Sequence, residues 1–381
     1  MTQMKVPFYG HVRQYHNLKE DIDKAISDVL ESGTYVLGPV MKRFEGELVE
    51  YMGMKHALGL NSGTDALWLA FIALGIGKGD EVITTSNTFF ATAEAIWLVG
   101  ATPVFVDCEA GTRNIDPALI EAKITPKTKA IVPVHLYGQP ANMPAIAEIA
   151  KKHNLLVVED CAQALGSKGD SFRIGELSDA VCTSFITAKN LGTFGDAGAV
   201  MTNRDDIIEP ILKMRNHGSN KRSHHSVGWN SRLDEIHAAI LSVKLKHIDE
   251  FNDARIARAK EYDQLLAGTG LNLPVGKSGY RHVYHLYVVE TPKRDDLQAF
   301  LQEKGITALT NYPIAIHEQE GFPFGAGDPK PVLPETEINS AQCLSLPIYP
   351  ELTAEEAKYV GEAVVEWDAQ NCSKGCCCCG K

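Results

Sequence analysis

The sequence predicts an α/β protein in which a large domain, built on a mainly parallel mixed sheet, is followed by a smaller α+β domain. Short apolar runs alternate with helix-like segments between residues 56 and 203, which is typical of parallel strands covered by helices on both faces. Amphipathic segments precede this region, and a mixture of helix and strand patterns follows it. The 381 residues are enough for two such domains.

Two helices are expected ahead of the sheet. Residues 18–33 and 39–53 carry apolar side chains three or four positions apart, and each segment closes on a glycine. The runs short enough for buried strands then follow at residues 56–60, 81–85, 102–107, 129–136, 154–160, 180–185 and 198–202. Helix-like patterns lie between them at residues 64–75 and 143–153.

The C-terminal part is expected to begin with a long helix. Residues 233–268 show a helical pattern with opposite charges four positions apart, and this helix would join the two domains. A strand at 284–290 and helices at 294–305 and 352–367 would complete the smaller domain. We therefore expect a large domain over residues 1–250, a small domain over 251–370 and a cysteine-rich tail over 371–381.

The composition of the chain indicates which kinds of partner and which cellular compartment to expect. The 37 lysines and arginines against 48 aspartates and glutamates give a net charge of −11, and no basic run is long, so no nucleic-acid partner is expected. The first residues lack the pattern of a signal peptide, and no apolar run is long enough to cross a bilayer, so neither secretion nor a membrane location is expected. The four cysteines of the body are expected to be reduced thiols of a cytoplasmic protein; they are Cys108, Cys161, Cys182 and Cys343.

The last ten residues hold the other five cysteines, Cys372 and the run from Cys376 to Cys379. Adjacent cysteines lack the spacing at which two thiolates turn toward one zinc ion. We therefore expect no metal site, and we interpret the tail as disordered or as a cloning or sequencing artefact.

Functional groups are expected where strands end at the carboxyl edge of the sheet. The turn at residues 61–66, NSGTDA, follows a strand and opens a helix, so Ser62, Gly63 and Thr64 offer backbone N–H groups and hydroxyls to an anion. An ordinary helix N-cap explains the same residues.

Asp160 and Lys189 are the candidate catalytic residues. Asp160 ends an apolar strand, where a carboxylate is costly without a cationic partner, although it could also cap the next helix. Lys189 follows a buried-looking strand and precedes a glycine-rich stretch, so its amine is expected to be partly desolvated and to suit Schiff-base formation. An amine, a carboxylate and an anion cradle are what pyridoxal 5′-phosphate (PLP) requires.

The ordered motifs resemble those of a known family. The segments SGTDAL, TSNTFFATAEAI, PVHLYGQPANM, VVEDCAQALGS, SFITAKNLGTFGDAGAV, MRNHGSNKRSHH, GWNSRLDEIHAAIL and LSLPIYPEL occur in the same order in the DegT/DnrJ/StrS sugar aminotransferases. These are PLP-dependent enzymes of fold type I, the aspartate aminotransferase fold, and the resemblance covers about residues 5–368.

The resemblance implies a role for each matching residue. Lys189 would form the Schiff base with the cofactor, Asp160 would pair with the pyridine nitrogen, and Gln163 would contact the phenolic oxygen. Phe89 would lie on the face of the ring. Gly63, Thr64 and Ser184 would hold the phosphate, and Asn230 would reach the phosphate of the neighbouring subunit's cofactor, which makes the protein a homodimer with a shared active site.

One motif departs from the family. The usual SFYPxK or SFHPxK is SFITAK here, with Ile186 and Thr187 in place of the aromatic residue and the proline. Because Lys189 is kept, the resemblance implies retained catalysis beside an altered cavity wall. It also disfavours the related dehydratase branch, which replaces the lysine with histidine.

The resemblance further implies amino transfer from glutamate to a nucleotide-linked keto sugar. The GDAGA form after the lysine favours C3 of a dTDP-3-keto-6-deoxyhexose; amination at C4, an aminocyclitol substrate and a non-catalytic regulatory protein remain alternatives. The residues expected to meet the nucleotide sugar are Tyr35, Tyr137, His217, Lys221, Arg222, Tyr312 and His317. The nucleotide, the sugar stereochemistry and the pathway product stay open.

Overall fold

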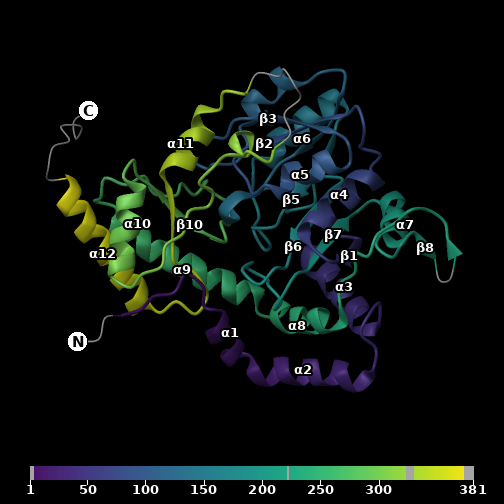
Figure 1. Cartoon of the computed structure of the whole chain (residues 1–381), viewed down its shortest axis with the longest axis horizontal. Coiled ribbons are helices and arrows are strands. Elements are labelled where there is room, and N and C mark those ends of the chain that lie inside the picture. The colour runs from purple at the N-terminus through teal and green to yellow at the C-terminus, as the bar shows by residue number, and fades with distance from the viewer. Residues whose placement is uncertain (1–3, 221–222, 323–329, 373–381) are drawn as a thin grey trace.

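The computed structural model describes residues 4–220, 223–322 and 330–372, and it divides into a large α/β part and a smaller C-terminal part (Figure 1). The large part contains a seven-stranded sheet in the order β1-β7-β6-β5-β4-β2-β3. Its strands are β1 (His56–Leu60), β2 (Glu81–Thr85), β3 (Thr102–Val106), β4 (Thr128–Val132), β5 (Leu156–Asp160), β6 (Ala180–Ser184) and β7 (Gly198–Thr202). The predicted strands of the sheet are thus all confirmed.

Only β7 runs against the other strands of this sheet. It pairs antiparallel with β1 and β6, whereas the remaining neighbours pair parallel. The carboxyl ends of β1, β5 and β6 therefore lie at one edge, together with the start of β7. Strand β4 is shorter than the predicted run 129–136, which continues into Pro133, a residue without a backbone N–H for the ladder.

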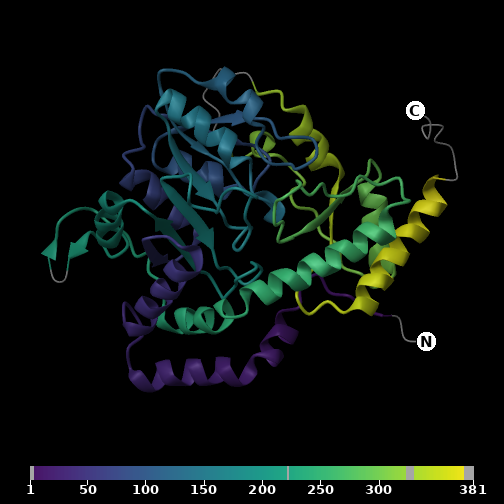
Figure 2. The ribbon, with the colours of Figure 1, turned by 180° about the vertical axis from the view of Figure 1, so that it is seen from behind.

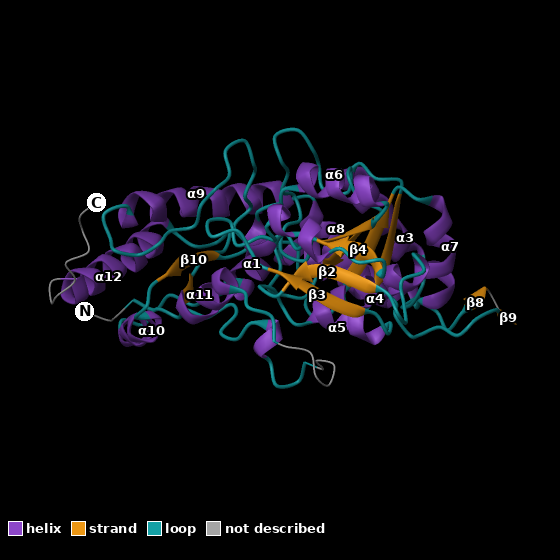
Figure 3. Ribbon diagram, turned by 90° about the horizontal axis from the view of Figure 1, so that it is seen from above, coloured by secondary structure: helices purple, strands orange, loops and turns teal. Residues whose placement is uncertain are grey.

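Helices cover both faces of the sheet because the strand side chains alternate (Figure 3). On one face, Val82 and Val158 pack with α4 (Gly63–Ala73), α5 (Ala91–Leu98) and α7 (Asp205–Met214). On the other face, Ile83 and Val157 pack with α6 (Met143–His153). Farther along that second face lie α3 (Pro39–Met52) and α8 (Glu235–Leu245).

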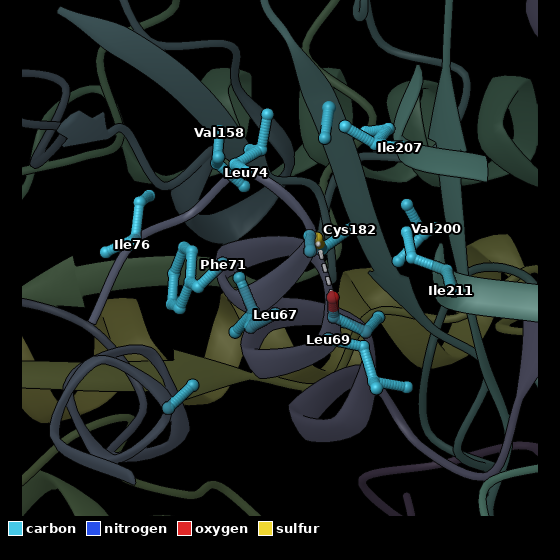
Figure 4. Close-up of a cluster of buried hydrophobic side chains, with 14 of the residues drawn as sticks. Leu67, Leu69, Phe71, Leu74, Ile76, Val158, Cys182, Val200, Ile207 and Ile211 are labelled. Atoms are coloured by element: carbon cyan, nitrogen blue, oxygen red, sulfur yellow. Dashed lines mark hydrogen bonds between the residues drawn. The ribbon is translucent and has the colours of Figure 1, made fainter. Parts of the chain in front are cut away.

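The helix α4 lies at the centre of the first core (Figure 4). Phe71 and Leu69 are fully buried, and the Sγ of Cys182 donates to the carbonyl oxygen of Ala66 at 3.3 Å. The helix is apolar around most of its circumference, as expected for a helix enclosed on several sides. This packing fixes the N-terminus of α4 at the edge of the sheet where β1 ends.

The smaller part is built from the chain after α8 and from a short N-terminal segment. It contains α9 (Ile248–Leu266), β10 (Tyr287–Glu290), α10 (Arg294–Glu303), α11 (Pro334–Gln342), β11 (Cys343–Leu346) and α12 (Ala354–Cys372). The strands β10 and β11 pair antiparallel. Val6 belongs to the same core, so the chain begins at the smaller part before α1 (His11–Asn17) and α2 (Lys19–Ser32) lead to the sheet.

The prediction of one long helix over residues 233–268 is wrong. These residues form two helices, α8 and α9, which meet at Lys246 and His247 (Figure 2). Asp249 and Glu250 in the first turn of α9 favour a new helix start there, because acidic side chains stabilise a helix N-terminus. The helix α9 spans residues 250 and 251, so the predicted domain boundary at that point stays a prediction.

No helix among the described residues is long and apolar enough to cross a membrane.

Candidate active site

A cavity of about 410 Å³ lies at the carboxyl edge of the sheet and is closed on one side by residues 285–286 and 311–312. Its lining brings together eight of the predicted site residues: Gly63, Thr64, Phe89, Asp160, Gln163, Ser184, Lys189 and Tyr312. They come from the segments that follow β1, β2, β5 and β6 or end those strands, and from the C-terminal part of the chain. The fold thus collects residues that are far apart in the sequence.

The anion cradle is the N-terminus of α4. Ser62 is the N-cap, and its Oγ accepts from the backbone N–H of Asp65 at 3.0 Å. The cap leaves the N–H groups of Gly63 and Thr64 at the positive end of the helix dipole. Ser184 lines the same cavity at the end of β6, and its hydroxyl accepts from the backbone N–H of Ile186 at 3.3 Å.

Two glycines allow these segments to approach closely. A Cβ at Gly63 would lie 2.8 Å from the Cβ of Ser184, and one at Gly198 would lie 2.3 Å from the carbonyl carbon of Ser62. Side chains at these positions would push β6 and β7 away from the start of α4. The cradle is therefore shaped by backbone contact, and helix N-termini of this kind bind phosphate groups.

Asp160 is held at the end of β5 by two hydrogen bonds. Oδ1 accepts from the backbone N–H of Ala162 at 3.1 Å, and Oδ2 accepts from the hydroxyl of Thr92 at 2.8 Å. The residue is only 6 % exposed. No helix follows Asp160 directly, so its carboxylate is not a helix cap; it is fixed at the cavity wall.

Lys189 lies in the loop between β6 and β7. Burial lowers the pKa of its amine to about 8, and the nearby carboxylate of Asp160 acts in the opposite direction. Lys244 on α8 braces this loop by donating from Nζ to the carbonyl oxygen of Gly192 at 2.7 Å. A desolvated amine with a lowered pKa is the form suited to attack an aldehyde.

Gln163 and Tyr312 line the cavity and are hydrogen-bonded to each other. The side chain of Gln163 accepts from the backbone N–H of Tyr137 at 2.7 Å and donates from Nε2 to the hydroxyl of Tyr312 at 3.0 Å. Phe89 is 57 % exposed, and its ring centroid lies 5.8 Å from that of Tyr312. An exposed aromatic ring at a cavity mouth offers a surface for stacking.

The residues present fit PLP. The cavity supplies an amine for the aldehyde, a carboxylate for the pyridine nitrogen and a helix N-terminus whose glycine at position 63 leaves the approach open. The individual contacts of these residues with the cofactor stay predictions.

Two of the predicted nucleotide-sugar residues lie outside this lining. Tyr35 is exposed near the start of α3, and its hydroxyl donates to the carbonyl oxygen of Leu30 at 3.2 Å. Tyr137 is buried and lines a second cavity of about 550 Å³; its backbone N–H donates to Gln163 at 2.7 Å, and its hydroxyl donates to the carbonyl oxygen of Asn311 at 2.6 Å.

Other predicted residues are also absent from this lining. His217 and Asn230 belong to the projecting segment between α7 and α8, near β8 (Ser219–Asn220) and β9 (Ser223–His224), and do not line the cavity of their own chain (Figure 1). His317 is buried with Nδ1 2.7 Å from the hydroxyl of Ser86 and is also absent from the described lining. Lys221, Arg222 and the cysteines from Cys376 onward lie outside the described residues.

The structure adds residues that sequence reasoning missed. Tyr9, Thr88, Thr92, His285 and Asn311 line the cavity. Thr92 and His285 sit inside apolar segments, at ATAEAI and YHLYVVE, where one polar residue among apolar neighbours is the available signal. That signal does not say which polar residue faces a site, because buried polar residues in other segments pair within the core.

The lowered pKa of Lys189 predicts how PLP binding depends on pH. The neutral amine attacks the aldehyde, so the association rate of PLP with cofactor-free protein should rise with pH and level off above about 8. Stopped-flow absorbance across pH 6 to 10 measures this rate, with the Lys189→Ala variant as a control for binding without attack. A midpoint near the ordinary lysine value of 10.5 would contradict the desolvated position.

Comparison with known proteins is consistent with this geometry. The model of the DegT/DnrJ/EryC1/StrS aminotransferase family matches residues 16–365. A pleiotropic regulatory protein of Geobacillus stearothermophilus is 46% identical over 368 residues, which cover 96% of this chain and 99% of that protein.

Two further matches concern amino sugars. The dTDP-3-amino-3,4,6-trideoxy-alpha-D-glucose transaminase of Streptomyces venezuelae is 45% identical over 365 residues, which cover 95% of this chain and 96% of the relative. The crystal structure of S. venezuelae DesV in complex with a ketimine intermediate matches with a TM-score of 0.92 at 45% identity, covering 96% of this chain and 98% of that chain.

Proposed function

Because the chain belongs to the DegT/DnrJ/EryC1/StrS aminotransferase family, we propose that it transfers the amino group of glutamate to C3 of a dTDP-linked 3-keto-6-deoxyhexose. The enzyme is a PLP-dependent transaminase of fold type I. The observation that carries the choice of acceptor is the 45% identity to a dTDP-3-amino sugar transaminase across nearly the whole of both chains. The GDAGA segment supports it, since Asp196 and Ala197 line the cavity where an acceptor would enter.

Different residues of the cavity would perform different steps of transamination. PLP supplies the electron sink that accepts the electrons released when a proton leaves the carbon bearing the amino group. Asp160, oriented by Thr92 and Ala162, would keep the pyridine nitrogen protonated. Lys189 would take the proton from the α-carbon of glutamate and deliver it to C4′ of the cofactor, and the reverse transfer would serve the sugar.

The phosphate would bind at the N-terminus of α4. The N–H groups of Gly63 and Thr64 and the hydroxyl of Ser184 would hold it, and the helix dipole favours its negative charge. Phe89 would offer its ring face to the cofactor and Lys189 its amine, since both residues line the same cavity.

The acceptor is tested by locating the transferred nitrogen. With ¹⁵N-glutamate and a dTDP-3-keto-6-deoxyhexose, we expect a product in which NMR shows ¹⁵N coupled to C3. The control reactions use the 4-keto isomer, an aminocyclitol ketone and the Lys189→Ala protein. Nitrogen at C4, or turnover of the aminocyclitol ketone alone, would contradict the proposed acceptor and leave the transaminase assignment in place.

A regulatory protein without turnover is the second candidate function, because the relative with 46% identity carries a regulatory name. The cavity with its amine, carboxylate and cradle favours the enzyme over this candidate. Tight binding of the nucleotide sugar with no transfer of nitrogen, across the whole panel of acceptors, would favour the regulator.

A homodimer with shared sites belongs to the proposal. Asn230 is exposed on a projecting segment and lies outside the cavity of its own chain, and its neighbours Trp229 and Val227 are exposed apolar residues. Exposed apolar side chains on a projection are typical of an interface. The segment would bring Asn230, and with it His217, to the partner's site.

Subunit mixing tests the shared site. The Lys189→Ala and Asn230→Asp proteins should each be nearly inactive, because the first lacks the amine and the second places a negative charge beside the phosphate. After subunit exchange, one site of each mixed dimer would combine the intact Lys189 with the intact Asn230, so part of the activity should return. Exchange shown by mass spectrometry without any recovery would count against this arrangement.

A cytoplasmic location is also proposed. The cysteines of the body, Cys108, Cys161, Cys182 and Cys343, are buried free thiols, which are typical of a reducing compartment.

A further inference from the structure

His285 lines the same cavity as Lys189, and its imidazole belongs to a chain of buried polar groups. The Nδ1 of His285 lies 3.0 Å from Oδ1 of Asn190, the residue that follows Lys189. The Nδ2 of Asn190 donates to Oδ1 of Asn252 at 2.7 Å and to the carbonyl oxygen of Val283 at 3.2 Å. These contacts connect the lysine loop, helix α9 and the segment that leads into β10.

Two backbone carbonyls fix the orientation of this chain. The carbonyl oxygen of Leu165 accepts from Nδ2 of Asn252 at 3.0 Å, so the amide oxygen of Asn252 must face Asn190. The carbonyl oxygen of Val283 likewise requires the amide nitrogen of Asn190 on its side. The amide oxygen of Asn190 therefore faces the imidazole, and Nδ1 of His285 must carry the hydrogen and donate it.

The ring of His285 is consequently neutral, with an unprotonated Nε2. Burial is the main cause that lowers the pKa of His285 well below its ordinary value, and the positive charges of Lys189 and Arg255 act in the same direction. The hydrogen bonds of the described residues include none to Nε2 of His285 or to Nζ of Lys189, and neither atom belongs to the fully buried side-chain atoms that lack a partner, so both are open to the cavity that the two residues line. Within the described part of the chain, the cavity thus contains an open imidazole acceptor and an open amine donor.

We propose that Nε2 of His285 accepts a hydrogen bond from the amine of Lys189 and so positions that amine for proton transfer. The role rests on the proposed function, because it concerns the step in which Lys189 moves a proton. His285 is a positioning residue: it exchanges no proton itself, since Asn190 holds its hydrogen on Nδ1. Orientation of this kind matters because a displacement of about 1 Å can cost about 100-fold in rate.

Two substitutions of His285 distinguish the effect of its Nε2 acceptor from the effect of its hydrogen bond to Asn190. His285→Asn keeps an amide that can donate to Asn190 and places nothing at the position of Nε2. His285→Gln extends the amide to that position and can present its oxygen to Lys189. Both remove the ring, so a loss of packing should affect them alike.

The first readout uses cofactor-free protein. Trace acetylation of Lys189, followed by mass spectrometry across pH 6 to 11, gives the pKa of its amine, which is about 8 in the unchanged chain. An acceptor stabilises the charged amine, so His285→Asn should lower this pKa by about one unit, whereas His285→Gln should stay close to the unchanged protein. Lys151, on the exposed surface of α6, is the internal control.

The second readout is the half-reaction of the PLP-loaded enzyme with glutamate. His285→Asn should lower its maximal rate by about 100-fold with little change in KM, and His285→Gln should recover a large part of that loss. If His285→Asn does not fold, Asn190→Ala removes the constraint on the ring and should shift the acetylation profile in the same direction.

The outcomes are distinct. An unchanged Lys189 pKa in His285→Asn, or equal losses in both variants together with a lowered melting temperature, overturns the positioning role. The acetylation result does not depend on any sugar acceptor, so failure of the proposed function would leave this readout intact, and failure here would leave the proposed function in place.

Discussion

Replacing Lys189 with alanine should lower turnover by about four orders of magnitude or more. General acid–base catalysis alone supplies up to about 10⁴-fold, and the variant also loses the covalent link to the cofactor. The remaining groups, the cradle at α4 and the carboxylate of Asp160, should still bind PLP more weakly and without the yellow Schiff-base absorbance. Single-turnover absorbance with glutamate measures both effects.

The matched control is Lys151→Ala, which removes an exposed lysine from α6. It should retain the rate, the PLP content and the absorbance of the unchanged protein. Activity of Lys189→Ala within a factor of ten of the unchanged protein would show that another group performs the proton transfer.

Asp160→Asn should lower the rate of both half-reactions by about three orders of magnitude. The loss of one preorganised electrostatic contact typically costs 10²–10³-fold, and a neutral amide cannot hold the pyridine nitrogen protonated. The fold should persist, because the amide oxygen can accept from the N–H of Ala162 while the amide nitrogen donates to the hydroxyl of Thr92, which accepts as well as donates.

The equal loss with glutamate and with the sugar distinguishes this role from substrate binding, since a substrate contact would affect one half-reaction. Asp170→Asn, which changes an exposed aspartate, is the control and should leave both rates unchanged. Rates of Asp160→Asn close to those of the unchanged protein would contradict its assignment to the ring nitrogen.

The strands of the sheet could be predicted because burial on both faces leaves uninterrupted apolar runs such as residues 156–160. Lys189 and Asp160 could be singled out because an ionisable residue at the end of such a run, or in the loop that follows it, is costly unless it has a partner. Their shared cavity also follows from the parallel pairing of β5 and β6, which brings both strand ends to one edge.

Other features depend on contacts between distant segments. The break between α8 and α9 lies within a continuous helical pattern, and the strand β11 follows α11 without a turn signal. Thr92 is hydrogen-bonded to Asp160, and His285 lies within hydrogen-bond distance of Asn190; each partner is distant in sequence. No local pattern encodes those hydrogen bonds, so sequence reasoning could not find them.

The substrate residues show the limit of reasoning from a resemblance. Tyr312 lies in the cavity, whereas Tyr35, Tyr137 and His317 do not. Their predicted contacts with the nucleotide sugar stay predictions without support from their positions in one chain. His217 and Asn230 could reach a substrate only if a second subunit approaches as proposed.

Borohydride reduction of the PLP-loaded enzyme tests the central claim most directly, because it fixes the cofactor to the lysine that binds it. Peptide mapping should place one phosphopyridoxyl group per chain on Lys189. The informative competitor is Lys244, whose pKa burial also lowers to about 8 but whose Nζ donates to the carbonyl oxygen of Gly192. The modification on Lys244, or on any lysine other than Lys189, would contradict the assignment of this cavity as the active site.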